Sequence, residues 1–395
     1  MFKFILTILL LFSFNSTVAK TWTGTEIETI QRFSIKHFEM PKDSSNKYLH
    51  NPKAIDLGKK LFHEERLSGN QKVSCNSCHI EKNAFTDNKN VAIGLRSGFR
   101  NTSTLENVGQ HHWFFADGAK DSLWAQALSS IENPAEQNFS RIELIHFIST
   151  DTIYRKQYEE LFNETLPSKV QLDKLPDKAG PNAKLEHLIA WKKLTPNQRK
   201  ETNIIFSNIG KAIAAYVSSI KSKPTRFDAF IDELKSQKNI STLNPSEQRG
   251  LALFISPKTG CSNCHSGPLF SNKTFHNIAT GIPGKDNGRS EIIESLIRDE
   301  FNCLSDYSDA KATECVELKY INKNKHQLAG TYKTSTLRSI KYTAPYMHDG
   351  RFKDLNEVIQ HYISKSKNKN LATDLNKIDL SKKEQSDLIN FLLTL

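Results

Sequence analysis

Cysteine and histidine occur twice in this chain in the spacing Cys-x-x-Cys-His. The first motif consists of Cys75, Cys78 and His79, and the second of Cys261, Cys264 and His265. Two thiols at this spacing can form thioether bonds to the two vinyl groups of one porphyrin, and the histidine that follows can ligate the iron. A zinc site would require a closed set of four ligands, and a redox dithiol has no use for the trailing histidine. The pattern therefore predicts two covalently bound c-type haems.

Two further cysteines, Cys303 and Cys315, remain after the four in the haem motifs. Both lie in one loop-like stretch of an exported protein, which favours a disulfide between them, and two free thiols are the alternative. Export is predicted because residues 1–19 are typical of a signal peptide, with Lys3, an apolar run over residues 4–12, and small residues before the end. No other apolar run approaches the roughly 20 residues of a membrane span. We expect a periplasmic protein.

The elements that must position the haem motifs are expected to be helices in two domains, because 395 residues exceed one hydrophobic core. Similar stretches, residues 56–62 and 248–254, precede the two motifs and hint at a duplication. Residues 209–220 are typical of a buried helix that ends near Pro224, where we place the boundary between domains 20–223 and 224–395. Capping boxes are expected at Ser140, Asn244 and Ser381.

The formal net charge is +11. A basic surface would attract an acidic protein partner, and the alternative is that lysines are simply spread over the surface for solubility. No basic stripe interleaved with aromatic residues is present in the sequence, so nucleic acid is not an expected partner.

Four further motifs accompany the haem motifs: Phe85-Thr-Asp87, Arg100-Asn-Thr-Ser-Thr-Leu105, Phe114-Phe-Ala-Asp-Gly118 and Thr343-Ala-Pro-Tyr-Met-His-Asp-Gly350. With them the chain resembles the bacterial dihaem cytochrome c peroxidases, a family that includes the MauG-like enzymes, over roughly residues 50–395. The resemblance implies a mainly α fold of two cytochrome c-like helical domains, each with one covalent c-type haem. It also implies a first haem that binds peroxide, a second haem that relays electrons, and an interdomain calcium ion.

The resemblance places the catalytic residues of the first haem at Gln126 and Glu136, with His79 as the proximal iron ligand. A carboxylate is what the chemistry needs, because one acid/base can take a proton from one peroxide oxygen and deliver it to the other. Taken without the family, Gln126 is a helix residue and Glu136 a solvated loop carboxylate. No histidine lies between Asp87 and Arg100, where many members carry one that caps the first iron. The first haem is therefore predicted to have an open or water-filled sixth site.

For the second haem, the family's proximal ligand maps to His265 and its distal ligand to Tyr362. Met347 is the alternative, and His361 is a competitor that should face another side of the helix. Tyr362 could also be a core residue. A phenolate ligand favours ferric iron, whereas a thioether favours ferrous iron, so the choice affects function.

Between the haems the family usually carries a tryptophan where this chain has Ala116. Trp113 and Trp124 are substitutes close in sequence, and each is equally explained as a packed aromatic. The family's calcium ligands map to Asn101, Thr343 and Pro345, which supply the oxygen atoms that this ion prefers.

These residues predict a cytochrome-c peroxidase that reduces hydrogen peroxide to water with electrons from a small periplasmic donor, a cytochrome c or a cupredoxin. The alternative is a MauG-like oxidase of a protein or small molecule, and a second alternative is a non-catalytic dihaem electron carrier. A homodimer is the family expectation.

Overall fold

The computed structural model describes residues 20–182, 184–236, 241–282, 284–366 and 373–395. The predicted signal peptide, residues 1–19, lies outside them. The fold is mainly helical, as predicted. The α-helices are α1 (Gly24–Gln31), α2 (Pro52–Phe62), α3 (Cys75–Cys78), α4 (Leu123–Glu132), α5 (Arg141–Thr150), α6 (Thr152–Phe162), α7 (Lys169–Leu172), α8 (Leu185–Lys193), α9 (Pro196–Ser219), α10 (Arg226–Ser236), α11 (Pro245–Ile255), α12 (Cys261–Cys264), α13 (Ile293–Ile297), α14 (Val316–Lys319), α15 (Lys325–Leu328), α16 (Leu355–Ser366) and α17 (Lys382–Leu392).

Short elements complete the fold. Strands β1 (Phe275–His276) and β2 (Tyr332–Lys333) pair antiparallel. The 3₁₀ helices are η1 (Ile35–His37), η2 (Glu65–Leu67), η3 (Glu81–Asn83), η4 (Val108–Gln110), η5 (Arg289–Glu291) and η6 (Ile340–Tyr342). The capping boxes predicted at Ser140, Asn244 and Ser381 are confirmed, since each side chain accepts from the third residue of its helix. Among the described residues, no helix is both long and apolar enough to cross a membrane.

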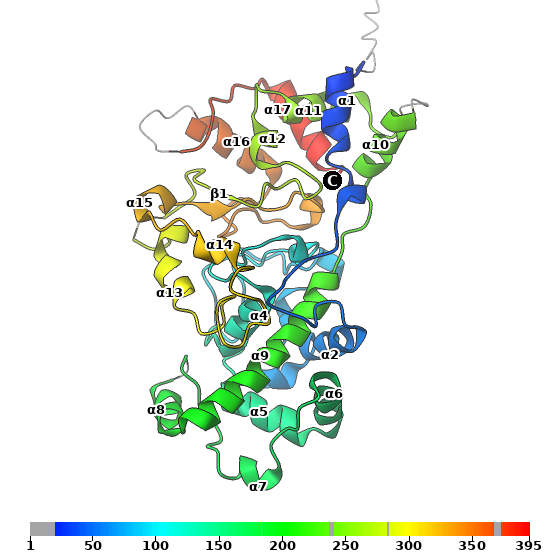
Figure 1. Ribbon diagram of the computed structural model, residues 1–395. Helices are drawn as coiled ribbons and strands as arrows, with labels where there is room; N and C mark the ends of the chain where they lie inside the picture. The colour runs from blue at the N-terminus through cyan, green and yellow to red at the C-terminus, as the bar shows by residue number, and fades with distance from the viewer. Residues whose placement is uncertain (1–19, 183, 237–240, 283, 367–372) are drawn as a thin grey trace, which may run out of the picture.

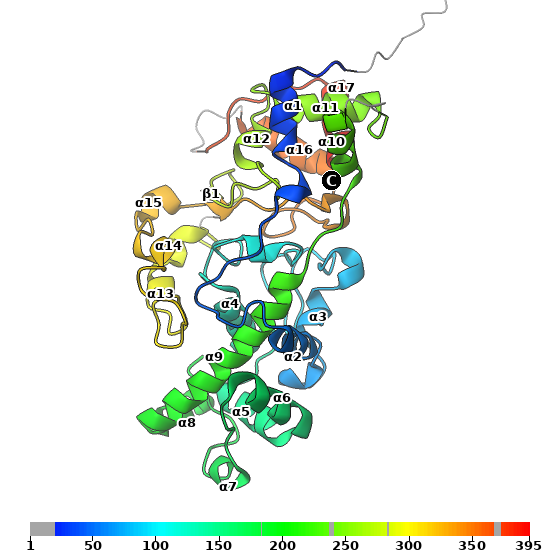
Figure 2. The same ribbon diagram turned by 45° about the vertical axis from the view of Figure 1, so that its right-hand side comes forward.

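Two lobes, each with its own hydrophobic core, make up the molecule (Figure 1). The first core lies among α2, α4, α5, α6 and α9, and the second among α1, α10, α11, α16 and α17. The long helix α9 runs through the first lobe, and the chain then crosses directly to α10 in the second lobe (Figure 2). Each haem motif lies in its own lobe, α3 in the first and α12 in the second.

Both lobes contain the same glycine-mediated helix crossing. Gly58 of α2 lies so close to α9 that a Cβ atom there would stand 1.9 Å from Ala212 O. Gly250 of α11 meets α17 in the same way, 1.9 Å from Asp387 O. The two glycines occupy corresponding places in the similar stretches 56–62 and 248–254. Only glycine allows backbones to approach this closely, so the short sequence similarity reflects a shared packing requirement.

A second repeated unit follows each haem motif. Residues 102–105 and 334–337 are both Thr-Ser-Thr-Leu, and each copy leads into a 3₁₀ turn, η4 or η6. A loop with the sequence Asp-Gly follows, closed by a backbone bridge between residues 114 and 120 or between residues 346 and 352. Helix α4 or α16 then begins. The spacing between corresponding residues is the same throughout, so the two units match residue by residue.

The structure differs from the predicted domain 20–223 at its beginning. Helix α1 packs with the second core, where Trp22, Ile30 and Phe33 are buried against residues of α10 and α11. Figures 1 and 2 show α1 beside the end of the chain, far from α2. The physical reason is the apolar face of this short helix, which is buried only against the second lobe.

The predicted domain 224–395 also differs, because part of it packs on the first lobe. Phe301 belongs to the first core, and Glu300 accepts from Arg141 at 2.6 Å. Asp309 pairs with the buried Lys211 of α9 at 2.7 Å. The same segment carries a disulfide that joins Cys303 to Cys315. Residues 300–315 therefore connect the two lobes, and the disulfide closes the part of this segment from residue 303 to residue 315.

Candidate active site

The two Cys-x-x-Cys-His motifs have the same backbone geometry. In each, the two cysteines begin and end a single helical turn, α3 or α12, and the histidine ends it. His79 has φ −99° and ψ 76°, and His265 has φ −94° and ψ 72°. None of the four cysteines forms a disulfide within the described residues. This geometry presents two thiols and one imidazole from one turn of chain in each lobe.

Each motif histidine is oriented by a backbone carbonyl. Nδ1 of His79 lies 3.0 Å from Phe85 O, and Nδ1 of His265 lies 2.8 Å from Phe270 O. Because a carbonyl oxygen only accepts, Nδ1 must carry the hydrogen, which leaves the Nε2 lone pair for a metal. Both phenylalanines have positive φ, 59° and 52°, a conformation that non-glycine residues rarely adopt.

The surroundings favour the neutral forms of these groups. Desolvation lowers the pKa of His79, and it lowers the pKa of His265 to about 4. Desolvation also raises the pKa of Cys75 to about 12 and that of Cys78 to about 11. Neutral imidazoles suit iron ligation, and thiols in apolar surroundings suit attachment to an apolar porphyrin edge.

Gln126 and Glu136, both predicted catalytic residues, are brought together through a residue that sequence reasoning missed. Gln126 Nε2 donates to Ser130 Oγ at 3.1 Å. Ser130 lies close enough to Glu136 to lower the pKa of its carboxyl group. Asn133 Nδ2 donates to Glu136 Oε1 at 2.7 Å. Desolvation raises the pKa of Glu136, and Ser130 and Asn133 partly oppose the rise. Glu136 also lies close enough to Cys75 and Cys78 to raise their pKa values, so it faces the first haem motif.

The backbone of Glu136 is fixed by the loop that lacks the family's capping histidine. Leu95 N donates to Glu136 O at 2.9 Å, and Arg96 N donates to Ala135 O at 3.0 Å. Gly94 lies against the same segment, where a Cβ would stand 2.7 Å from Glu136 Cα. The loop between Asp87 and Arg100 therefore packs on the carboxylate segment, and it supports Glu136 without contributing an imidazole.

In the second lobe, Tyr362 of α16 faces the second haem motif. Desolvation raises its pKa, and the charges of Cys261 and Cys264 raise it further. The ring also packs against the second core. The position of Tyr362 therefore fits both predictions, that of an iron ligand and that of a core residue. The neighbouring His361 is turned elsewhere, with Nε2 2.7 Å from Ile278 O. Met347 is partly buried and has φ 73°. Nothing in this geometry excludes Met347, and the ligand choice stays a prediction.

Both tryptophans considered as inter-haem bridges are packed. Trp124 is fully buried in the first core, where Nε1 donates to Ser45 Oγ at 2.8 Å. Trp113 belongs to a small separate core and contacts the Arg289 guanidinium, 4.3 Å from its ring centre. These contacts are those of structural aromatic residues.

At the junction of the lobes lies a stacked pair that the sequence did not reveal. The ring of His348 stacks on that of Tyr332, with centroids 3.8 Å apart and planes 12° apart. His348 corresponds to Ala116 in the repeated unit. The sequence signal that could have singled out His348 is its place directly before the repeated Asp-Gly pair, where the first unit has Ala116.

An arginine joins the two halves of the chain at the same junction. Arg100 donates to Asp117 Oδ2 at 2.6 Å and to both carboxylate oxygens of Asp286 at 2.9 Å. Nearby, Lys333 N donates to Ala116 O at 2.8 Å. Charge and backbone pairing thus hold together the loops that follow the two haem motifs.

The residues predicted to bind calcium lie at this junction. Asn101 N donates to His348 O at 2.7 Å, and Asn101 Nδ2 donates to Lys89 O, which leaves Oδ1 for a cation. Asn88 Nδ2 donates to the carbonyls on either side of Thr343, at residues 342 and 344. Within the described part of the chain, no cluster of three His, Cys, Asp or Glu could hold a metal. The predicted site uses an amide and carbonyls, so calcium stays a prediction.

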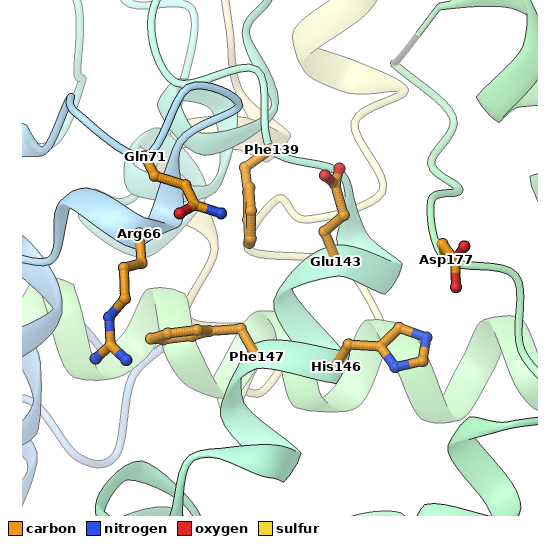
Figure 3. A pocket seen from close by; sticks show the side chains of 7 residues that line it. All are labelled: Arg66, Gln71, Phe139, Glu143, His146, Phe147 and Asp177. Carbon is orange, nitrogen blue, oxygen red and sulfur yellow. The ribbon is translucent and has the colours of Figure 1, made fainter.

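A separate pocket of about 320 Å³ lies on the first lobe. Figure 3 shows Glu143, His146 and Phe147 extending from α5, opposite Arg66 and Gln71. Two of its charged residues have structural partners: Arg66 pairs with Glu64, and Glu143 caps α5 and pairs with Lys178. None of the predicted site residues lines it, so we assign it no function.

The similarity to known proteins agrees with this geometry. A family model for di-haem cytochrome c peroxidases matches residues 52–236. Residues 52–236 thus match the dihaem cytochrome c peroxidase family, which includes MauG. Proteins of this family are oxidoreductases with two haems, and the two motifs of this chain provide the cysteines and free Nε2 atoms that two haems require.

Relatives of this chain carry both kinds of name. Cytochrome-c peroxidase IdrP2 of Pseudomonas sp. (strain SCT) is 27% identical over 350 residues, which cover 87% of this chain and 82% of the relative. The methylamine utilization protein MauG of Methylophilus methylotrophus is 27% identical over 367 residues, 91% of this chain and 87% of the relative. The structure of the diheme peroxidase BthA from Burkholderia thailandensis matches with a TM-score of 0.64 at 20% identity, covering 87% of this chain and 86% of that one, and shows the fold.

Proposed function

We propose that the protein is a periplasmic cytochrome-c peroxidase that reduces hydrogen peroxide to water at the first haem. The observation that carries the proposal is the half-buried Glu136, which faces the first haem motif and is held by Ser130 and Asn133. Family members named as cytochrome-c peroxidases support it. Two domains, divided near residue 223, would carry one haem each.

In this proposal, the first haem is held by Cys75, Cys78 and His79, and the second by Cys261, Cys264 and His265. When bound, the haem irons supply the redox chemistry that cleaves the O–O bond and accepts electrons from the donor. Glu136 would take a proton from one peroxide oxygen and deliver it to the leaving oxygen. Its raised pKa suits both steps, because the carboxylate must bind and release a proton within one turnover.

The other predicted site residues would orient the peroxide, cap the second iron or bind calcium. Gln126, through its bond to Ser130, is positioned to contact the peroxide beside Glu136. Tyr362 is proposed to cap the second iron, with Met347 as the alternative. The donor would be a small cytochrome c or cupredoxin attracted by the basic surface. Asn101, Thr343 and Pro345 would hold a calcium ion at the junction of the lobes, since amide and carbonyl oxygens suit this cation.

A MauG-like oxidase is the second candidate. The orientation of Tyr362 toward Cys261 and Cys264 favours it, because a phenolate ligand lowers the reduction potential and makes the second haem a better store of oxidising equivalents. In that case a protein or small molecule, rather than a donor cytochrome, would be oxidised.

The test is steady-state peroxide consumption with a reduced cytochrome c or cupredoxin, in wild type and Glu136→Gln. Glu65→Gln is the matched control, since Glu65 is an exposed glutamate of the same lobe. The proposal expects turnover in wild type and control and a loss of about 100-fold or more in Glu136→Gln. Turnover with an organic or protein substrate alone would favour the oxidase. Equal, negligible rates in all three proteins would favour an electron carrier.

A further inference from the structure

The repeated unit allows the two haem pockets to be compared position by position. Asn107 and Ser339 have φ 57° and 59°, Phe115 and Met347 have 65° and 73°, and both loops place Gly after Asp with positive φ. The backbone bonds also correspond: the amide of residue 114 donates to the carbonyl of 120 at 2.8 Å, and that of 346 to 352 at 2.7 Å. The helices that follow begin at Leu123 and Leu355.

This match identifies the residue of the first lobe that is equivalent to Tyr362 in the second. Counted from the start of each helix, Ser130 in α4 and Tyr362 in α16 are both the eighth residue. Their preceding neighbours also correspond, and His361 is turned away to Ile278 O. Helices that begin at matched points and follow matched loops present the same face, so Ser130 and Tyr362 should point the same way.

Independent contacts support this orientation. Tyr362 interacts with the cysteines of its own haem motif, Cys261 and Cys264. Ser130 accepts from Gln126 and lies beside Glu136, which is close enough to Cys75 and Cys78 of the other motif to raise their pKa values. Tyr362 therefore lies near the cysteines of its motif, and Ser130 lies beside a carboxylate that is near the cysteines of the other motif. The residue one turn earlier is Gln126 in the first lobe and the apolar Val358 in the second.

We propose that Ser130 determines which haem reacts. At the equivalent position, the second lobe places the phenol of Tyr362 toward its haem. Ser130 instead leaves the first haem open and connects Gln126 with Glu136. The inference rests on the proposed function for the identity of the reacting ligand. A serine side chain ends one atom beyond Cβ, a full aromatic ring short of the tyrosine hydroxyl, so it cannot cap the iron.

The hydroxyl has a second role. Because Gln126 donates to Ser130 Oγ, the single hydroxyl hydrogen of Ser130 is free to donate to the Glu136 carboxylate. The direction of this chain fixes the Gln126 amide, with its nitrogen toward Ser130 and its oxygen available to a ligand. Ser130 is thus a positioning residue that acts through Gln126 and Glu136.

The first experiment exchanges the side chains and measures ligation, not turnover. Ser130→Tyr, Tyr362→Phe and wild type are compared in the haem-loaded, oxidised state by electron paramagnetic resonance and by the number of haems that bind cyanide. Ser129→Tyr is the matched control, because position 129 corresponds to the outward-turned His361. We expect one cyanide per chain in wild type and control, none in Ser130→Tyr at concentrations that saturate wild type, and two in Tyr362→Phe.

The second experiment tests the hydroxyl. Ser130→Ala should shift the acid limb of the peroxide reaction to higher pH, because Glu136 loses a hydrogen bond that stabilises its charged form, and Ser130→Thr should restore the wild-type profile. If Ser130→Tyr and Tyr362→Phe both keep the wild-type cyanide number, the inference is overturned. If the cyanide numbers follow expectation while wild type consumes no peroxide, the inference stands and the proposed function fails.

Discussion

At the scale of single residues, two carboxyl groups have surroundings that raise their pKa values. Glu136 is the functional case: desolvation raises its pKa, and Ser130 and Asn133 hold the charged form against that rise. Asp121 is the structural case, a buried carboxylate that accepts from Cys303 N at 2.8 Å while its other oxygen has no partner within the described residues. The two groups should respond to pH in different measurements.

For Glu136, the prediction concerns catalysis. The ionised form must accept the first proton, so kcat/KM for peroxide should fall as the pH drops through the pKa of Glu136, which lies above its ordinary value. Glu136→Gln should remove this acid limb and lower kcat/KM by about 100-fold or more. The measurement is the pH profile of peroxide consumption in both proteins. An unchanged profile in the variant would show that another group carries the proton.

For Asp121, the prediction concerns stability. Desolvation raises its pKa to about 6, so the folded state binds the proton more tightly than the unfolded state does. The free energy of unfolding should therefore fall as pH rises between about 4 and about 6. Asp121→Asn should remove this component and be more stable than wild type by about 3 kcal/mol at pH 7, with no gain below pH 4. Guanidinium unfolding at both pH values checks it; a gain of the same size at both would contradict it.

At the scale of elements, the two lobes are built around the same helix contacts. Gly58 and Gly250 lie at the crossings of α2 with α9 and of α11 with α17. The sequence suggested this only weakly, through seven similar residues, because the partner helices are distant in the chain. Capping boxes at Ser140, Asn244 and Ser381 were predictable because they depend on local spacing alone.

Adding one methyl group at either crossing should therefore be costly. Gly58→Ala or Gly250→Ala would place Cβ 1.9 Å from a backbone oxygen, so the helices must move apart. We expect a loss of about 2 kcal/mol or more in the free energy of unfolding for each. Gly24→Ala is the control, since nothing lies within 4 Å of its Cβ position, and should change stability by less than about 1 kcal/mol. Equal stability of all three variants would refute the shared crossing.

Some residues of the candidate site could be predicted from the sequence, and others could not. The Cys-x-x-Cys-His motifs were readable because their chemistry is contained in five adjacent residues. The role of Ser130 could not be predicted, because it depends on the register of α4 relative to α16 and on the hydrogen bond from Gln126. The same holds for Tyr332 and His348, whose stacking joins residues that no local pattern relates.

At the scale of the whole molecule, the lobes are joined by more than the chain that crosses between them. Helix α1 packs on the second core, and residues 300–315 pack on the first. The predicted division at residue 223 could not include either feature, because both depend on long-range burial of apolar residues. Arg100, between Asp117 and Asp286, provides a charged connection at the same junction.

Removing that connection should weaken the contact between lobes. Arg100→Met would leave Asp117 and Asp286 buried without their cation, which should lower the free energy of unfolding by about 3 kcal/mol or more. Arg32→Met is the control, because Arg32 and Glu28 form an exposed pair worth at most about 1 kcal/mol. Thermal unfolding monitored by circular dichroism compares the two. A loss no larger than that of the control would mean that Arg100 does not hold the lobes together.

The central claim is that two covalent haems are present and that only the first is open to a ligand. The most direct measurement is a cyanide titration of the oxidised protein, matured with a competent cytochrome c assembly system, alongside its intact mass. The account predicts a mass increase of two haems and one cyanide bound per chain. A chain with one haem or none, or two haems that both bind or both refuse cyanide, would contradict it.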